Sequence, residues 1–85
     1  MKSFDNILKK LLDNFILPKF EDIISYELSL VYDNVYNILF WMDGTDEETE
    51  KEIVYECQNI LQYYDIPNVK VLYNFTVDGG NSYDY

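Results

Sequence analysis

The sequence predicts an α+β domain with the order α-β-β-α-β, in which a three-stranded sheet is packed by two helices on one face. Two observations predict this class. Apolar residues recur with helical spacing in two segments. Three other segments alternate between apolar and polar residues, or between two apolar faces, as strands do. A chain of 85 residues is long enough for one such domain, expected over 1–77, with a flexible acidic tail over 78–85.

The first predicted helix covers residues 3–16, SFDNILKKLLDNFI. Its apolar residues follow one another in alternating steps of three and one, which produces a continuous stripe along a helix. Ser3 is a suitable N-cap, and Pro18 follows the segment closely and should end it. We therefore expect one face of this helix to pack against the sheet.

Residues 24–32 and 35–42 form the predicted hairpin, joined by a two-residue turn at Asp33 and Asn34. Such a turn would place Leu28 opposite Leu39. The first segment is apolar on one face and the second on both, so the second is expected to be the central strand. With this register, partial exposure is expected for side chains on the other face of the second strand, namely Tyr36, Ile38, Phe40 or Met42.

A second helix is predicted to begin at Thr45, because Thr45 and Glu48 match a capping box, and to run to about Tyr64. Its expected buried stripe consists of Ile53, Cys57, Ile60, Leu61 and Tyr64. Residues 69–77, VKVLYNFTV, alternate again and form the third predicted strand.

The charge is strongly negative and unevenly distributed. Sixteen acidic residues face six basic ones, all lysines, for a net charge of −10. Residues 1–19 hold four lysines and two aspartates (+2), and residues 20–85 hold fourteen acids and two lysines (−12). Such a field repels nucleic acids and anionic membranes and attracts basic proteins. The expected partner is therefore a basic protein, with no direct binding of nucleic acid or membrane.

The residue types argue against catalysis. The chain has no histidine and no arginine, which removes the commonest general base and the commonest phosphate clamp. The single cysteine, Cys57, allows no internal disulfide and reads as a core residue. The sequence DGTDEE lacks the ligand spacing of a calcium loop. No apolar run approaches the ~20 residues of a membrane span. We expect a cytoplasmic protein that is not an enzyme and carries no metal or cofactor.

The segment TDEETEKEIVYE, residues 45–56, holds six carboxylates and one lysine. Those in the first turn interact favourably with the helix dipole, which is an ordinary structural role. Glu48, Glu52 and Glu56 instead follow one another four residues apart, where like charges are mildly destabilising. Each step rises ~6 Å, which is comparable to the distance between successive phosphates of a nucleic-acid strand. Two interpretations remain open: nucleic-acid mimicry and an ordinary solvated face.

Tyrosines next to carboxylates suit a protein interface, because the rings pack on lysine and arginine stems while the carboxylates pair with the charged groups. Tyr55 and Tyr63 fall away from the apolar stripe of the second predicted helix. The candidate partner-binding residues are acidic side chains of that helix and of the loops, together with one tyrosine: Asp33, Asp43, Asp46, Glu47, Glu48, Glu52, Tyr55 and Glu56.

In size, sign of charge and tyrosine content the chain resembles small acidic phage inhibitors that occupy the nucleic-acid site of a host enzyme, anti-CRISPR proteins among them. It is similar in the same way to acidic immunity proteins that neutralise basic nuclease toxins. The resemblance concerns composition and assigns no residue a role. It implies an inhibitor of a nucleic-acid-binding protein, with an immunity protein or antitoxin as the alternative. A homo-oligomeric structural subunit, in which Ile38, Phe40 and Met42 or the edge of the third strand form the contact, is the remaining hypothesis.

Overall fold

The computed structural model describes residues 4–44, 46–66 and 69–77. The predicted order of elements is confirmed: α1 (Asp5–Leu11) continues into a short π-helix, η1 (Leu12–Ile16), and is followed by β1 (Ile23–Tyr32), β2 (Val35–Met42), α2 (Glu47–Tyr63) and β3 (Lys70–Val77). Ser3 and the tail over 78–85, for which we made predictions, lie outside the described residues.

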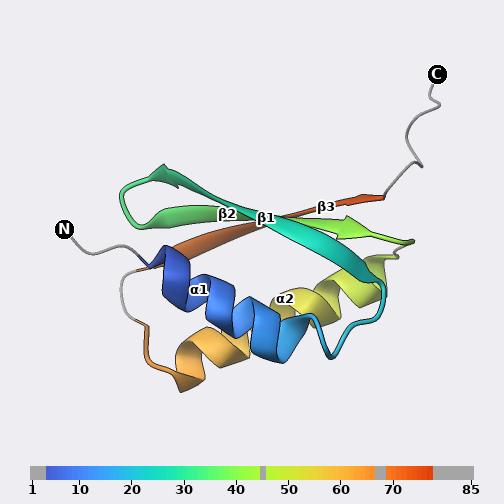
Figure 1. Ribbon diagram of the computed structural model, residues 1–85, viewed down its shortest axis with the longest axis horizontal. Coiled ribbons are helices and arrows are strands. Elements are labelled where there is room, and N and C mark those ends of the chain that lie inside the picture. The colour runs from blue at the N-terminus through green and yellow to red at the C-terminus, as the bar shows by residue number, and fades with distance from the viewer. Residues whose placement is uncertain (1–3, 45, 67–68, 78–85) are drawn as a thin grey trace.

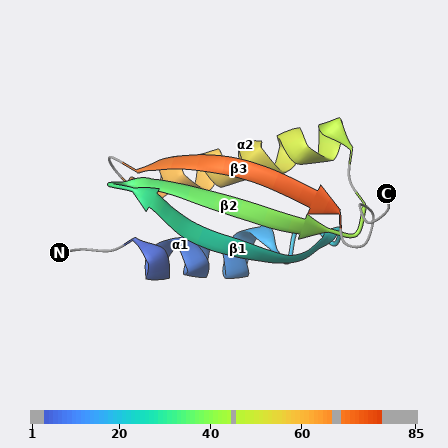
Figure 2. The same cartoon turned by 90° about the horizontal axis from the view of Figure 1, so that it is seen from above.

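The three strands form one mixed sheet in the order β1-β2-β3. β1 pairs with β2 in antiparallel orientation, and β2 pairs with β3 in parallel orientation. Figure 1 shows both helices on the same side of the sheet, as predicted. Seen from above in Figure 2, the opposite face of the sheet carries no helix formed by the described residues. β2 is therefore the central strand, and β1 and β3 are the edges.

β1 carries two extra residues relative to β2, and they decide which side chains face the helices. Its pairing shifts between Ile23 and Ser25 and again between Leu30 and Tyr32, so that Ile24 and Val31 are bulged. The second bulge adjoins the turn, where Asn34 adopts a left-handed φ of 60°. Because the bulges change the register by one residue, Leu28 lies opposite Ile38 rather than opposite Leu39.

The predicted exposure on β2 is therefore wrong. Tyr36, Ile38, Phe40 and Met42 are between 0% and 3% exposed and lie in the core. The shifted register puts them on the same face as Tyr26 and Leu28 of β1, and the helices cover that face. It follows that the apolar face predicted for self-association, Ile38, Phe40 and Met42, is not at the surface.

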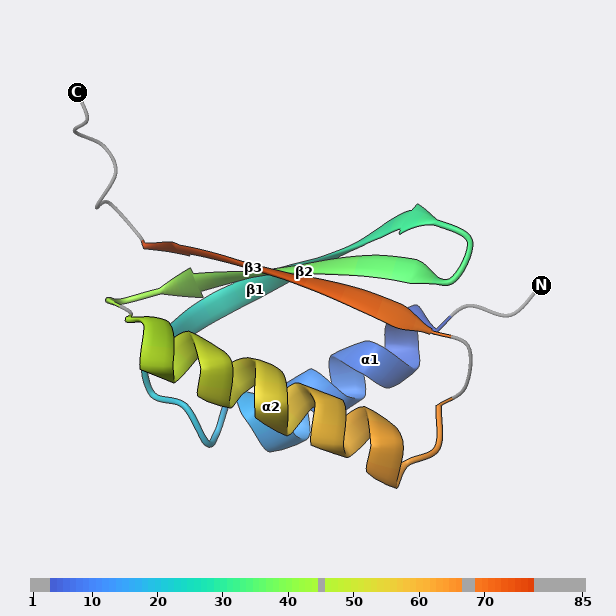
Figure 3. The same ribbon diagram turned by 180° about the vertical axis from the view of Figure 1, so that it is seen from behind.

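The helices contribute the other half of the core. Leu12 and Ile16 of η1 and Ile53 and Cys57 of α2 pack with the β2 side chains in one cluster. Phe75 of β3 stacks on Phe40, with ring centroids 5.4 Å apart. Figure 3 shows both helices beneath the sheet, and Phe15 of η1 contacts Tyr64 at the end of α2, with ring centroids 5.8 Å apart. The two helices therefore pack against each other as well as against the sheet.

The first helix widens into a π-turn just before Pro18. The Leu17 N–H donates to the Leu12 carbonyl at 2.9 Å, a five-residue step. The helix ends there because a proline has no N–H to continue the hydrogen bonding. The Tyr26 hydroxyl donates to Asp13 Oδ1 at 2.9 Å and ties η1 to β1. Burial and this carboxylate raise the pKa of Tyr26 to about 12.

α2 differs from its prediction at both ends. Its N-cap is Asp46 rather than Thr45, which lies outside the described residues. At the other end Tyr64, expected in the core, is 47% exposed. Neither α2 nor the first helix has the length and apolar character needed to cross a membrane.

The assignment of faces on β2 can be tested by replacing Phe40 with alanine. Phe40 is completely buried, so Phe40→Ala should lower the free energy of unfolding by about 3–5 kcal/mol. Leu72→Ala is the control, because Leu72 lies on the uncovered face and is 41% exposed; its cost should be below about 1 kcal/mol. Urea unfolding followed by circular dichroism measures both. Equal costs would contradict the register described here.

Candidate partner-binding surface

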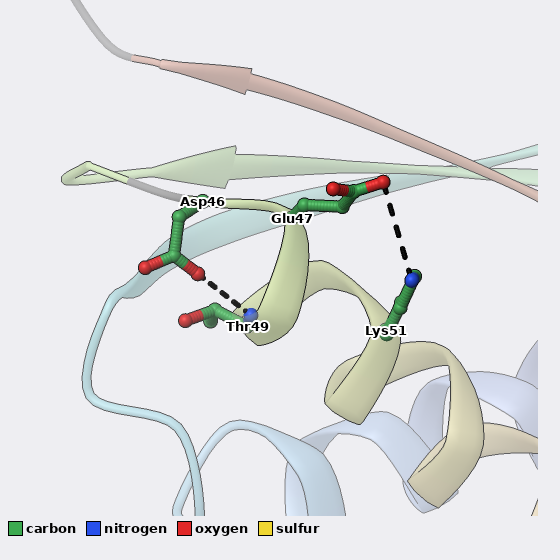
Figure 4. Close-up of polar contacts among 4 residues, drawn as sticks. All are labelled: Asp46, Glu47, Thr49 and Lys51. Carbon is green, nitrogen blue, oxygen red and sulfur yellow. Dashed lines mark hydrogen bonds and ion pairs between the residues drawn. The ribbon is translucent and has the colours of Figure 1, made fainter.

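The acidic part of α2 begins with a cap that the carboxylates themselves provide. Asp46 is extended (φ −140°), and its Oδ1 accepts the Thr49 N–H at 2.8 Å (Figure 4). Hydrogen bonds from the backbone N–H and the side chain of Thr49 lower the pKa of Asp46. Glu47, Glu48 and Glu50 follow in the first turn, where the helix dipole favours negative charge. Part of the acidic cluster therefore stabilises the helix, whatever else it does.

The three glutamates that follow one another four residues apart in α2 differ in their surroundings: two are exposed and one forms an ion pair. Glu48 and Glu52 are exposed, and no ion pair joins them to a lysine among the described residues. Glu56 is half-buried and lies 2.9 Å from Lys19 Nζ. Lys19 follows η1 and is distant from Glu56 in the sequence, so the spacing of residues along α2 could not predict this ion pair. The third position therefore connects α2 to the first helical segment and is electrically neutralised.

Glu47 has a much looser partner. Its carboxylate lies 4.0 Å from Lys51 Nζ, and both side chains are largely exposed (Figure 4). Exposed pairs one helical turn apart contribute little, about 0.3–0.5 kcal/mol. Glu47 is therefore available to a stronger cationic partner.

The loops bring further carboxylates to this end of the molecule. The Asp43 N–H donates to the Asp22 carbonyl at 2.8 Å, which places the end of β2 next to the start of β1. Asp22, Asp43 and the neighbouring Glu21 are all exposed. We name this region the acidic end; it comprises Glu21, Asp22, Asp43, Asp46, Glu47, Glu48 and Glu52. Glu21 and Asp22 were not predicted as partner-binding residues, because only the pairing of β1 with β2 brings them close to Asp43.

Asp33 is not part of the acidic end. It lies in the exposed turn between β1 and β2, at the opposite end of the sheet from Asp43 (Figure 1). An eight-residue strand separates the two, and a strand rises roughly 3.3 Å per residue, or about 26 Å in all. The structure therefore does not bring Asp33 together with the other candidates.

Tyr55 lies where the sequence placed it, at the exposed surface of α2. Its side chain is 62% exposed. It follows Glu52 by three residues and Glu48 by seven, so the three share one face of the helix. We name these three residues the outer stripe. Along the axis it spans roughly 10 Å, at 1.5 Å per residue.

A second group of exposed rings lies at the end of α2. Tyr63 is 80% exposed and contacts Tyr64 edge to face, with centroids 4.9 Å apart. Tyr64 in turn contacts Phe15 of η1 at 5.8 Å. Sequence reasoning singled out Tyr63 but placed Phe15 and Tyr64 on apolar helical stripes. Phe15 is 42% exposed and Tyr64 is 47% exposed, so neither lies in the core.

The described residues show no arrangement suited to metal binding, because no group of three or more acidic or thiol side chains converges there. Between the helices lies a cavity of about 20 Å³, lined by apolar side chains, Cys57 and Tyr73. That space is about enough for one water molecule. Burial, with a smaller effect of Glu56, raises the pKa of Cys57 to about 12. The thiol is therefore protonated at neutral pH and inert, as expected of a core residue.

Comparison of the chain with protein-family models, with curated proteins and with solved structures returned no significant match.

The capping role of Asp46 predicts a pH-dependent stability difference. Its pKa is lowered in the folded protein, so its contribution is present above its unfolded pKa and is lost as the pH falls through its folded pKa. Asp46→Ala should lower the melting temperature at pH 7, and the difference from the parent should shrink on acidification. Asp46→Asn is the control, because asparagine caps without titrating. A difference that does not change with pH would contradict this role.

The buried thiol predicts slow chemical modification. At pH 8 iodoacetamide should alkylate Cys57 at least about a hundredfold more slowly in the native protein than in denaturant, because the thiolate is the reacting form. Mass spectrometry measures both rates on the same sample. Comparable rates would show that the thiol is accessible and ionised.

Proposed function

We propose that this chain is a small, acidic, non-catalytic inhibitor that acts in the cytoplasm. It binds the basic nucleic-acid-binding surface of a target protein and blocks it by nucleic-acid mimicry. The observation that carries this proposal is the outer stripe, in which Glu48, Glu52 and Tyr55 are all exposed on one face of a regular helix.

The outer stripe lies on a helix whose backbone is fixed. α2 is fixed by its cap at Asp46 and by the burial of Ile53 and Cys57. Glu48 and Glu52 are therefore presented with a constant spacing of ~6 Å along the axis. A groove that binds consecutive phosphates presents cations with comparable spacing. A helix that is already folded also loses less backbone entropy on binding than a flexible segment would.

Each part of the surface has a distinct role in this complex. The outer stripe pairs with lysine and arginine groups of the target, and Tyr55 packs against their aliphatic stems. The remaining carboxylates of the acidic end strengthen the field that draws the two proteins together. Association should therefore be fast and should weaken with salt.

The same surface suits a basic toxin, in which case the chain would be an immunity protein or antitoxin. The two functions share one binding mechanism and differ in the origin of the target. A toxin gene beside the gene for this chain would favour the second, and a phage early region would favour the first.

The double variant Glu48→Gln/Glu52→Gln tests the proposal. The immobilised parent captures targets from a bacterial lysate at low salt and releases them at high salt. Each released protein is then bound to fluorescent duplex DNA, and displacement by the parent and by the variant is measured. The parent should displace the DNA, and the variant should need at least about tenfold more protein, equivalent to 1.4 kcal/mol.

A second double variant, Glu27→Gln/Asp33→Asn, is the matched control. It removes the same charge from the uncovered sheet face and the distant turn, and it should compete like the parent. Glu56→Gln should mainly affect stability, because it breaks the ion pair with Lys19. If Glu48→Gln/Glu52→Gln competes as well as the parent, or if DNA and the parent bind the target together, the proposal is wrong.

A further inference from the structure

The outer edge of β3 is regular and pairs with no other strand among the described residues. The Lys70 N–H donates to the Asn34 carbonyl at 2.8 Å, and the parallel register then continues without a shift to Val77. In a parallel pair, alternate residues direct both backbone groups to the neighbour. Lys70, Leu72, Asn74 and Thr76 therefore bond to β2, and Val71, Tyr73 and Phe75 direct their N–H and C=O groups away from the sheet.

The two edges of the sheet differ in how they are protected. β1 has two bulges, which disrupt the addition of another strand. β3 has no bulge and no proline, and its only charged residue is Lys70 at its start. A continuous edge of this kind is a template for strand pairing.

α2 lies below this edge and extends past it. Figure 2 shows the N-terminal half of α2 extending beyond β3 on the side away from β2. Two open hollows lie between β3 and α2. One of about 410 Å³ is lined by Val54, Tyr73 and Phe75 together with Glu47, Glu50 and Lys51. The other, of about 480 Å³, is lined mainly by Leu61, Val71, Tyr73 and amide side chains. Alternate side chains of an added strand would enter these hollows.

Charge and shape restrict what can occupy the edge. Glu47, Glu50 and Lys51 lie at the end where β3 finishes and together carry a net negative charge, and Lys70 lies where β3 starts. A segment with lysine or arginine at the Glu47 end complements this distribution. A second copy of the chain fits poorly, because the overhanging α2 of each copy would meet that of the other and each carries a charge of −10.

We propose that the outer edge of β3 binds an extended segment of a partner protein as a fourth strand. Val71, Tyr73 and Phe75 form the backbone hydrogen bonds, alternate apolar side chains of the segment enter the hollows above α2, and Glu47 and Glu50 bind its basic end. This mode is strand addition, in which the backbone supplies affinity and the hollows supply specificity. It does not depend on nucleic-acid mimicry.

Two synthetic octapeptides test the proposal. Both alternate valine and threonine, and they carry two lysines at either the N-terminus or the C-terminus, which report antiparallel and parallel addition respectively. At a concentration about ninefold above its Kd, the better peptide should slow amide hydrogen exchange of Val71, Tyr73 and Phe75 about tenfold. Leu72 and Asn74 already bond to β2 and should change little. NMR spectroscopy resolves each amide.

Matched controls separate strand addition from charge attraction. The same peptide with N-methyl groups on the residues that face β3 should give no protection. Glu47→Gln/Glu50→Gln should weaken the lysine peptide about tenfold, whereas Glu48→Gln/Glu52→Gln, which removes equal charge from the outer face of the same helix, should not. Three results would overturn the proposal: no protection on β3, equal protection by the N-methylated peptide, or protection in the free protein that rises with its own concentration, which would indicate a second copy at this edge.

Discussion

The structure depends on one extra residue, Val31, beside the β1–β2 turn. A two-residue turn followed by regular pairing would put the apolar face of β1 opposite the wrong face of β2. The bulge shifts the pairing by one position, so that Tyr26 lies opposite Phe40 and Leu28 opposite Ile38. Both strands then offer an apolar surface to the same side, and the two helices can cover it. A similar shift at Ile24 returns Ile23 to the core.

Because the register places both helices on one side of the sheet, it also determines which residues and which strand edges lie at the surface. Since both helices lie on one side, the other side of the sheet is uncovered and carries a mixture of polar and apolar residues. Polar contacts order it: the Trp41 indole N–H donates to Glu27 at 3.2 Å, and Asn74 donates to Asn37. β2 pairs on both sides, so β1 and β3 must be edges. The bulges that align the core also protect the β1 edge, whereas β3 has neither bulge nor proline.

The carboxylates of α2 serve two purposes that residue type alone does not separate. Asp46 caps the helix, and Glu56 joins it to the first helical segment through Lys19. Glu48 and Glu52 do neither among the described residues. Their repulsion at a four-residue spacing is a small cost that the buried face of α2 outweighs. Because neither forms a cap or an ion pair among the described residues, both are available for the proposed interaction with a basic protein.

The sequence by itself determined the order of the elements and nearly all their boundaries, because these depend on local periodicity, turn residues and helix ends. It also determined the excess of negative charge and the outward position of Tyr55. Only the tertiary structure decided the strand register, the burial of Tyr36, Ile38, Phe40 and Met42, the pairing of Glu56 with Lys19, and the approach of Asp22 to Asp43. The physical reason is that a single bulged residue reverses which side of a strand faces the core. Contacts between distant segments likewise follow from how the layers pack, which periodicity does not record.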